Sequence, residues 1–359
     1  MRRTLAVAVT LILVAGTGLM TPPGRWALDR ARDEADLILT LRELGAERAA
    51  GNAMLEMPDG VRLATDVYLP DDATRPLPAI LVRLPYGKRR YFEVERWLRV
   101  FLPRGYAVVA QDMRGRFGSE GVFAPYPNAA GDGAATLDWI AAQPWSDGRV
   151  GTIGCSALGE SQIMLATRRH PAHRAMIPIS AGGAIGTARG VHGFFGVIEG
   201  GIPELASTFG WFTRHGGKTA GHMGGVPVDF AEGLATLPFR DAVARYRDDP
   251  TDFEALLDGI ARPEALRAWG YIADDDRFAA PALLADGWFD SAVRSTLALA
   301  EVIGDSAPRP RVLIAPGTHC DLGGGFRRGE VGDVPVDPEQ AVDFDAIYAD
   351  FMEARLKGA

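Results

Sequence analysis

The sequence predicts an α/β protein built on a mostly parallel, doubly wound sheet. Its first sign is a set of short, nearly continuous apolar runs, typical of strands buried on both faces of a parallel sheet. These runs are Pro78–Val82, Ala107–Gln111, Val150–Cys155, Ala175–Ile179, Pro281–Ala285 and Arg311–Ala315. The second sign is that helical patterns separate several of the runs, as at Ala130–Gln143 and Gly159–Arg169. Strands that alternate with helices predict βαβ units with helices on both faces of one sheet.

The segments around this core predict three further elements. Two extended segments, Asn52–Met57 and Arg62–Tyr68, flank the turn sequence Pro58-Asp59-Gly60, which predicts an antiparallel hairpin at a sheet edge. Before them, Trp26–Glu47 has apolar residues at near-helical spacing, so we expect residues 25–50 to form a leading amphipathic helix. Val342–Leu356 predicts one terminal helix.

The stretch between Ile179 and Pro281 is too long for a single crossover. It contains glycine-rich loops and then helical patterns near Pro238–Tyr246, Asp252–Ile260 and Pro263–Trp269. We therefore expect residues 185–275 to form an inserted, mostly helical cap. Residues 51–184 and 276–359 then form the α/β core.

The N-terminus, residues 1–24, has the features of a secretory signal peptide. Arg2 and Arg3 precede an apolar run, Leu5–Val14, and small residues follow it. The run is shorter than the roughly 20 apolar residues of a spanning helix, which favours cleavage. We expect a periplasmic or secreted protein; the alternatives are a membrane anchor formed by residues 5–20 and a buried N-terminal helix.

Charge and composition argue against several classes of partner. The formal net charge is −8, and the chain has no block of Lys and Arg that would favour a nucleic-acid partner. There is no H-E-x-x-H motif, and the two cysteines lack metal-ligand spacing, so we expect no metal and no cofactor. The sequence leaves the oligomeric state open.

Gly154-Cys155-Ser156-Ala157-Leu158-Gly159 lies where an apolar strand passes into a helix. A nucleophile elbow has this context, because a tight strand-to-helix turn holds its serine above the carboxyl edge of the sheet. Glycines flank such a serine because a side chain there would collide with the neighbouring strand or helix. The common motif is G-x-S-x-G; here the second glycine comes one residue later. The segment therefore predicts Ser156 as a nucleophile, and on its own it is weak evidence.

A serine nucleophile needs a base, and His319 is the candidate among six histidines. It follows the last predicted strand, and Asp290 follows the strand before that. Loops that leave the carboxyl ends of parallel strands open onto one sheet edge. The order Ser156, Asp290, His319 is that of the α/β-hydrolase triad. We therefore predict the α/β-hydrolase fold, with His319 as base and Asp290 as the residue that orients it.

Several longer motifs occur in one order along the chain. They are Met57–Leu63, Arg83–Lys88, Asp112–Gly121, Trp139-Ile140, Gln143–Trp145, Gly287–Asp290 and Gly317–His319. Together they resemble the α/β-hydrolases grouped with cocaine esterase, X-prolyl dipeptidyl peptidases and α-amino-acid ester hydrolases, the CocE/NonD-type group. The resemblance spans about residues 52 to 325.

This resemblance implies an oxyanion site that composition does not suggest. The hydroxyl of Tyr86 and the backbone N–H of Ala157 would donate to the oxyanion that develops during acyl transfer. The alternative for Tyr86 is a core tyrosine on an edge loop. We expect Asp112, Arg114 and Ser119 to form a charge-paired loop that shapes the edge of the site.

The chain departs from this group at four points. Ala157 replaces a common tyrosine, and Gly87 stands where aspartate is frequent. Ser291-Ala292-Val293 lacks the two acidic residues that bind a substrate ammonium in amino-acid ester hydrolases, which disfavours free α-amino-acid derivatives. Many relatives continue into a C-terminal β-sandwich domain, and we expect none here.

The prediction is a serine hydrolase that cleaves a small-molecule carboxylic ester, or less favourably an amide, through an acyl-enzyme on Ser156. The alternatives are an X-prolyl dipeptidyl-type peptidase and a catalytically silent envelope binding protein on the same fold. The acyl group and the alcohol stay open.

Cys155 and Cys320 flank the predicted nucleophile and base. Successive side chains of a strand point to opposite faces, so Cys155 should turn into the interior as Ser156 turns outward. Cys320, taken as part of an extended loop, should also point away from the meeting point of Ser156 and His319. We therefore expect two free thiols.

Overall fold

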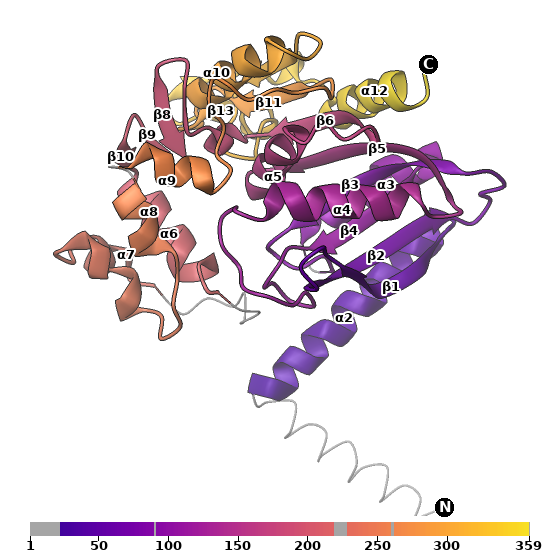
Figure 1. Ribbon diagram of the computed structural model, residues 1–359, viewed down its shortest axis with the longest axis horizontal. Helices are drawn as coiled ribbons and strands as arrows, with labels where there is room; N and C mark the ends of the chain where they lie inside the picture. Colours follow the sequence, from indigo (N-terminus) through magenta and orange to yellow (C-terminus); the bar gives the residue numbers. More distant parts are fainter. Residues whose placement is uncertain (1–21, 90, 219–227, 260–261, 359) are drawn as a thin grey trace, which may run out of the picture.

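An eight-stranded sheet with helices on both faces forms the body of the computed structural model (Figure 1). The structure describes residues 22–89, 91–218, 228–259 and 262–358. Most of the predicted signal peptide, residues 1–21, lies outside the described residues. None of the helices in the described ranges has the length and apolar character needed to cross a membrane.

The sheet has the predicted mostly parallel topology, in the order β1-β2-β4-β3-β5-β6-β11-β12. β1 pairs antiparallel with β2 and β2 with β4, whereas β4, β3, β5, β6, β11 and β12 run parallel. All six predicted strands and the edge hairpin are confirmed, but β12 lies at the edge of the sheet and most of its residues are exposed or half-buried rather than buried on both faces. The strands are β1 (Ala46–Glu56), β2 (Arg62–Pro70), β3 (Leu77–Leu84), β4 (Ala107–Asp112), β5 (Ser146–Cys155), β6 (His173–Ile179), β11 (Leu283–Gly287) and β12 (Arg311–Ala315).

Helices pack against both faces of this sheet and bury its apolar side chains. One face carries α4 (Ala129–Ala141), α5 (Ala157–Ala166) and α10 (Val293–Gly304), whose apolar residues cluster with those of the strands. The other face carries α3 (Phe92–Phe101), which runs on into η1 (Leu102–Arg104), and α12 (Phe344–Leu356). The chain thus has the α/β-hydrolase fold.

The leading helix α2 (Pro22–Glu43) ends earlier than the sequence predicts, because β1 already begins at Ala46. Gly45 adopts a left-handed φ of 59° between the two elements, a conformation that glycine reaches without strain. Ala46 to Ala50 then pair with β2 across an irregular register. Alanine and charged residues in this stretch favour a helix. The stretch forms a strand instead because its backbone pairs with β2.

The segment between β6 and β11 holds helices and a small second sheet. Its helices are η2 (Gly182–Ala184), α6 (Leu205–His215), α7 (Phe230–Leu234), η3 (Phe239–Asp241), η4 (Val243–Arg245), α8 (Phe253–Gly259) and α9 (Pro263–Ala268). The sheet, which the sequence did not predict, has the order β10-β9-β8-β7, from β7 (Thr187–Ala188), β8 (Val191–Phe194), β9 (Ile198–Glu199) and β10 (Ile202–Pro203). In Figure 1, α6 to α9 gather to one side of the main sheet.

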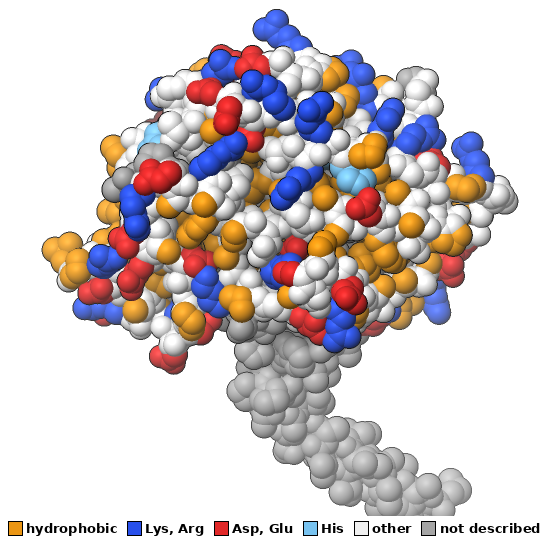
Figure 2. Space-filling model, viewed as in Figure 1, with side chains coloured by type: hydrophobic (Ala, Val, Ile, Leu, Met, Phe, Trp, Pro, Cys, Tyr) orange, Lys and Arg blue, Asp and Glu red, His pale blue; other side chains and the backbone are white. Residues whose placement is uncertain are grey.

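Short elements follow β12 before the terminal helix. They are α11 (Gly324–Arg328), β13 (Glu330–Val331), β14 (Val334–Pro335) and η5 (Pro338–Gln340). On the face of the molecule in Figure 2, acidic and basic side chains are interspersed rather than separated by sign. Surface ion pairs among the described residues include Arg240 with Asp258 (3.1 Å) and Arg267 with Asp275 (3.2 Å).

Candidate active site

The predicted site residues all follow strands that end at one edge of the sheet. In the parallel registers, Cys155 of β5 pairs with Ile179 of β6, and Ile179 pairs with Ala285 of β11. Ala285 pairs in turn with Leu313 of β12. Because these strands are parallel and in register, the loops that follow them begin side by side, as the sequence predicted.

Ser156 has the backbone conformation of a nucleophile elbow. Its φ of 58° and ψ of −128° lie between the end of β5 and the start of α5, a conformation that non-glycine residues rarely adopt. A Cβ on Gly154 would lie 2.5 Å from the Cβ of Leu158, and a Cβ on Gly159 would lie 2.7 Å from that of Ala181. Both glycines are therefore required by close packing, as the sequence indicated.

Asp290 and His319 form a hydrogen-bonded pair. The distance between His319 Nδ1 and Asp290 Oδ2 is 2.8 Å, and the Asp290 side chain is buried whereas that of His319 is 47% exposed. A carboxylate only accepts hydrogen bonds, so Nδ1 carries the proton and Nε2 keeps its lone pair. The hydrogen bond to Asp290 therefore fixes the orientation of the imidazole ring, and Nε2 is available as a base.

The pKa values of this pair move apart. Burial acts to raise the pKa of Asp290, but the hydrogen bond and charge of His319 outweigh it and lower that pKa below its ordinary value. Burial acts to lower the pKa of His319, and the Asp290 hydrogen bond and charge raise it above the ordinary value. Each shift means that the pair favours an ionised carboxylate beside a more basic imidazole.

Hydrogen bonds hold both the elbow and the histidine loop to the residues at the end of β6. The Ser156 N–H donates to the Ile179 carbonyl (2.9 Å), and the Cys320 N–H donates to the Ser180 hydroxyl (3.2 Å). Within the described residues, no hydrogen bond joins the Ser156 side chain to His319. Such a bond is often long in a hydrolase without ligand and tightens when substrate binds.

Asp286, which the sequence reading missed, supports Asp290 from the end of β11. It is fully buried and accepts hydrogen bonds from the Ser180 hydroxyl (3.1 Å), from the Thr296 hydroxyl and from the Gly287 N–H (2.8 Å). Burial, and then the charge of Asp290, raise the pKa of Asp286. The sequence offered one signal for Asp286, which is that an acidic residue stands inside an apolar strand, four positions before Asp290.

The prediction of two free thiols is wrong, because Cys155 and Cys320 form a disulfide with Cα atoms 5.8 Å apart. Cys155 is buried and faces the α3 and α12 layer, as expected. Cys320 is not extended: its φ is 61°, within a tight turn in which the Asp321 N–H donates to the Thr318 carbonyl (3.1 Å). Both cysteine side chains therefore turn into the same layer, where they meet.

Tyr86 lies just beyond β3, beside the elbow. Leu81 of β3 pairs with Thr152 of β5, so the two strands approach this edge together. The Trp211 Nε1–H of α6 donates to the Tyr86 hydroxyl oxygen (3.1 Å), which leaves the hydroxyl hydrogen for another acceptor. Burial, opposed by the Trp211 hydrogen bond, raises the pKa of Tyr86 to about 12. The hydroxyl is thus a proton-bearing donor at neutral pH.

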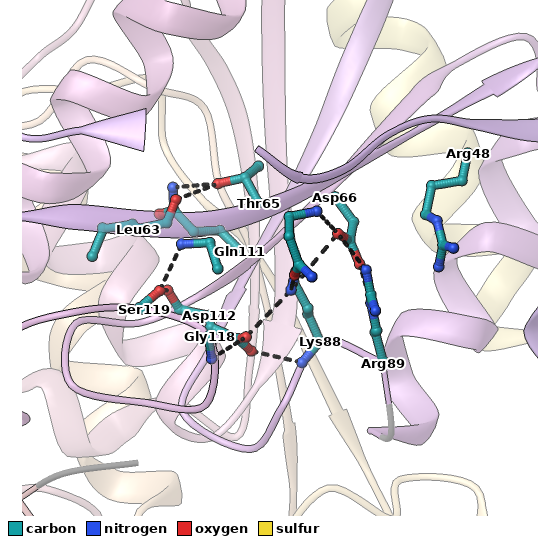
Figure 3. A network of polar contacts seen from close by, with 12 residues as sticks. Arg48, Leu63, Thr65, Asp66, Lys88, Arg89, Gln111, Asp112, Gly118 and Ser119 are labelled. Carbon is teal, nitrogen blue, oxygen red and sulfur yellow. Dashed lines mark hydrogen bonds and ion pairs between the residues drawn. The ribbon is translucent and has the colours of Figure 1, made fainter. Parts of the chain in front are cut away.

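A buried network of charged side chains fixes the loop that carries Tyr86 (Figure 3). Lys88 Nζ contacts Asn52 Oδ1 (2.7 Å), Asp112 Oδ2 (3.4 Å) and Asp66 Oδ1 (3.7 Å). The Lys88 N–H donates to Asp112 Oδ1 (2.8 Å), and Arg89 Nε donates to Asp66 Oδ2 (2.9 Å). Lys88, Asp66 and Asp112 are almost fully buried, so removal of one charge would leave its partners without compensation.

Asp112, Arg114 and Ser119 form the charge-paired loop that the sequence predicted. The Ser119 hydroxyl donates to the Asp112 carbonyl (2.6 Å), and Arg114 pairs with Asp132 (2.6 Å) and Asp59 (2.7 Å). Each of these side chains has a structural partner, so none is needed to contact a substrate.

Phe117 explains why glycine replaces the frequent aspartate at position 87. Gly87 has a φ of 93°, and a Cβ there would lie 2.9 Å from the Phe117 ring. The left-handed backbone and the ring together exclude a side chain at this position.

Glu160, one turn into α5, adds a buried carboxyl group near the Asp290–His319 pair. It is 2% exposed, and burial raises its pKa to about 7, with smaller opposing effects from Tyr126 and His319. Its Oε1 would lie 2.3 Å from a Cβ on Gly183, so a glycine is needed opposite it. Across the ranges that the structure describes, no group of three or more metal-ligating side chains is arranged to hold an ion.

The sequence matches the model of the X-Pro dipeptidyl-peptidase (S15) family over residues 59–321, which is more than half of the chain. The chain belongs to this family. The cocaine esterase of Rhodococcus sp. (strain MB1 Bresler) is 32% identical over 332 residues, which make up 88% of this chain and 56% of that protein. This family member therefore spans about half the length of the curated relatives it matches.

Solved structures share the fold at lower sequence identity. An aminopeptidase from a marine sediment archaeon (Thaumarchaeota archaeon) is similar with a TM-score of 0.65 and 20% identity, over 88% of this chain and 55% of that one. An α-amino acid ester hydrolase is similar with a TM-score of 0.59 and 22% identity, over 87% and 54%. At these sequence identities, the structural similarity shows only the fold of this family member.

Proposed function

We propose that this family member is a serine hydrolase that cleaves carboxylic esters through an acyl-enzyme on Ser156. The Asp290–His319 hydrogen bond of 2.8 Å, at the sheet edge where the Ser156 elbow lies, is the observation that carries the proposal. The 32% identity with a cocaine esterase supports an ester as the substrate class.

In this mechanism His319 Nε2 takes the hydroxyl proton of Ser156 as Ser156 Oγ attacks the ester carbonyl carbon. Negative charge grows on the carbonyl oxygen, where the Tyr86 hydroxyl and the Ala157 N–H stabilise it. The Ala157 N–H lies in the first turn of α5, where N–H groups have no partner within the helix. His319 then protonates the leaving alcohol, and a water molecule activated by His319 releases the acid.

Amide cleavage of the X-prolyl dipeptidyl type is the second candidate, and the family match favours it. A dipeptidyl peptidase must accommodate the free ammonium of its substrate, which is costly to bury without an acidic partner. The segment after Asp290 provides no acidic side chain; instead the Ala292 N–H donates to Asp290 Oδ1 (3.1 Å). This local chemistry supports the ester over the peptide.

A substrate panel separates the two candidates. p-Nitrophenyl esters of increasing acyl length are compared with X-Pro-anilides on the same enzyme preparation, and kcat/KM is measured for each. An esterase should turn over at least one ester with a kcat/KM well above that of every anilide. Efficient cleavage of the anilides alone would replace the ester proposal with the peptidase.

We expect kcat/KM for an ester to decrease as the pH is lowered, following the protonation of a single group. Only neutral His319 can accept the Ser156 proton, and its Asp290 partner raises the pKa of His319 above the ordinary value of 6.5. Half of the plateau rate should therefore be reached above pH 6.5, and activity should be lost as the pH falls below that point. A plateau that extends unchanged to pH 5 would contradict a base held by Asp290.

Tyr86→Phe should lower kcat about 100- to 1,000-fold while KM changes little, because an oxyanion donor acts mainly in the transition state. Steady-state kinetics with one p-nitrophenyl ester measure both constants. Tyr91→Phe is the matched control, since Tyr91 packs against Tyr86 with ring centroids 4.9 Å apart. A pure KM effect of Tyr86→Phe would make Tyr86 a substrate-contact residue instead.

We propose that the protein acts outside the cytoplasm. The charged and apolar pattern of residues 2–14 supports export, and so does the Cys155–Cys320 disulfide, because disulfides persist mainly in oxidising compartments. Fractionation of native cells tests this. Full-length protein in the cytosol with both cysteines reduced would contradict export.

A further inference from the structure

A disulfide bond joins the two chain segments that carry the nucleophile and the base of the proposed mechanism. Cys155 directly precedes Ser156, and Cys320 directly follows His319, although the two cysteines are 165 positions apart in the sequence. A covalent bond between these neighbours limits how far the elbow and the histidine loop can move apart.

The two sides of this bond differ in how firmly the rest of the protein holds them. On the elbow side, Cys155 is 3% exposed and its N–H donates to Oε2 of the buried Glu93 (3.0 Å). On the other side, His319 is 47% exposed and Cys320 is half-buried in a tight turn. The disulfide therefore ties the more open loop to the more firmly packed elbow.

A cavity of about 370 Å³ reaches this bond from the face of the sheet that α3 and α12 cover. Both cysteines line it, together with Glu93 of α3, Tyr348 and Phe344 of α12, and Arg327. Its volume lies in the range of small-molecule pockets and far exceeds the roughly 30 Å³ of one water molecule. Ser156 and His319 do not line it, so a molecule could enter without occupying the ester site.

We propose, building on the hydrolase function above, that the Cys155–Cys320 disulfide is a positioning cross-link that a small dithiol can open through this cavity. Cys155 and Cys320 are positioning residues, since they act through Ser156 and His319. Opening the cross-link leaves the Asp290–His319 hydrogen bond intact, but the bonded pair is no longer tied to the elbow and can move away from Ser156. Misplacement of a reacting group by 1 Å can cost about 100-fold in rate.

Opening is a two-step thiol–disulfide exchange. A thiolate of the dithiol attacks the sulfur of Cys320, the more exposed half; a new mixed disulfide forms, the Cys155–Cys320 bond breaks, and Cys155 leaves as a thiolate that takes a proton from water. The second thiolate of the dithiol attacks the mixed disulfide and releases Cys320, which is also protonated. The protein gains two electrons and two protons, and the dithiol becomes a cyclic disulfide.

The test uses the full-length native protein and dithiothreitol as the dithiol. The protein is reduced without denaturant, freed of dithiothreitol by gel filtration, and compared with untreated protein for accessible thiols and for hydrolysis of a p-nitrophenyl ester. We expect two thiols to appear and kcat to fall about 10- to 100-fold, with KM changed less than about threefold. Reoxidation with oxidised glutathione should restore kcat.

The acidic limb of the pH profile separates a positioning role from general unfolding. Because Asp290 still holds His319, the limb should keep its midpoint after reduction, whereas unfolding would abolish it. Cys155→Ala/Cys320→Ala should have the kcat of the reduced enzyme and no response to dithiothreitol. If this double variant does not fold, Cys320→Ala alone provides the same comparison.

Two results would overturn the inference while leaving the hydrolase proposal intact. One is a reduced enzyme with two free thiols and an unchanged kcat. The other is a disulfide that stays closed in the native protein under conditions that reduce it after unfolding. Failure of the untreated, oxidised protein to hydrolyse any ester would instead count against the hydrolase function.

Discussion

Ser156→Ala should reduce ester hydrolysis to below about a thousandth of the wild-type kcat, with the fold intact. The substitution removes only the attacking oxygen, and the remaining base and oxyanion donors cannot supply a covalent intermediate. The measurement is kcat for the best p-nitrophenyl ester, together with the circular dichroism spectrum and melting temperature of both proteins.

Ser161→Ala is the matched control for this variant. Ser161 lies on the same helix, α5, is 2% exposed, and donates its hydroxyl to the Leu158 carbonyl (3.0 Å). We expect this variant to keep kcat within a few-fold of wild type. A Ser156→Ala enzyme that keeps more than about a thousandth of the rate would show that another group is the nucleophile.

Asp290→Asn should lower kcat by about 10,000-fold. An amide can present its NH₂ to His319, which favours the tautomer that lacks a lone pair at Nε2, so the base is in the wrong form. Loss of the carboxylate also removes the hydrogen bond and the charge that raise the pKa of His319. The residual activity should therefore show an acidic limb displaced toward lower pH.

The structure offers a matched control in a second histidine–aspartate pair. His170 Nε2 and Asp138 Oδ1 lie 2.9 Å apart on the surface. Asp138→Asn removes a similar carboxylate and should leave kcat within about twofold of wild type. Equal losses in Asp138→Asn and Asp290→Asn would indicate a general effect of charge and would remove Asp290 from the proposed mechanism.

The sequence carried enough information to predict the core of the fold. The strands of a parallel sheet covered by helices are typically short apolar runs, and such runs occur at β3, β4, β5, β6, β11 and β12. The candidate site could be predicted for the same reason: Ser156, Asp290 and His319 each follow one of these runs, and parallel strands bring their ends to one edge. Close packing at Gly154 also follows from local chain geometry, because the side chain it would meet belongs to Leu158, four positions later.

The features that the sequence did not reveal depend on contacts between distant segments. Trp211 donates a hydrogen bond to Tyr86 although the two residues are 125 positions apart. Trp211 belongs to an inserted segment, and the local sequence does not predict where that segment packs. The disulfide was missed because strand alternation was applied to Cys320, which lies in a turn with a φ of 61°. Asp286 was missed because a buried carboxyl group in an apolar strand becomes informative only once Ser180 and Thr296 are seen to face it.

Labelling with a fluorophosphonate probe tests the central proposal most directly, because the probe phosphonylates a serine only when a base activates it. The full-length protein is treated with the probe, digested and mapped by mass spectrometry, with Ser156→Ala and Ser161→Ala as the comparison proteins. We expect one stoichiometric adduct on Ser156, present in Ser161→Ala and absent in Ser156→Ala. An unlabelled wild-type protein, as expected of a silent binding protein, or an adduct that persists in Ser156→Ala, would contradict it.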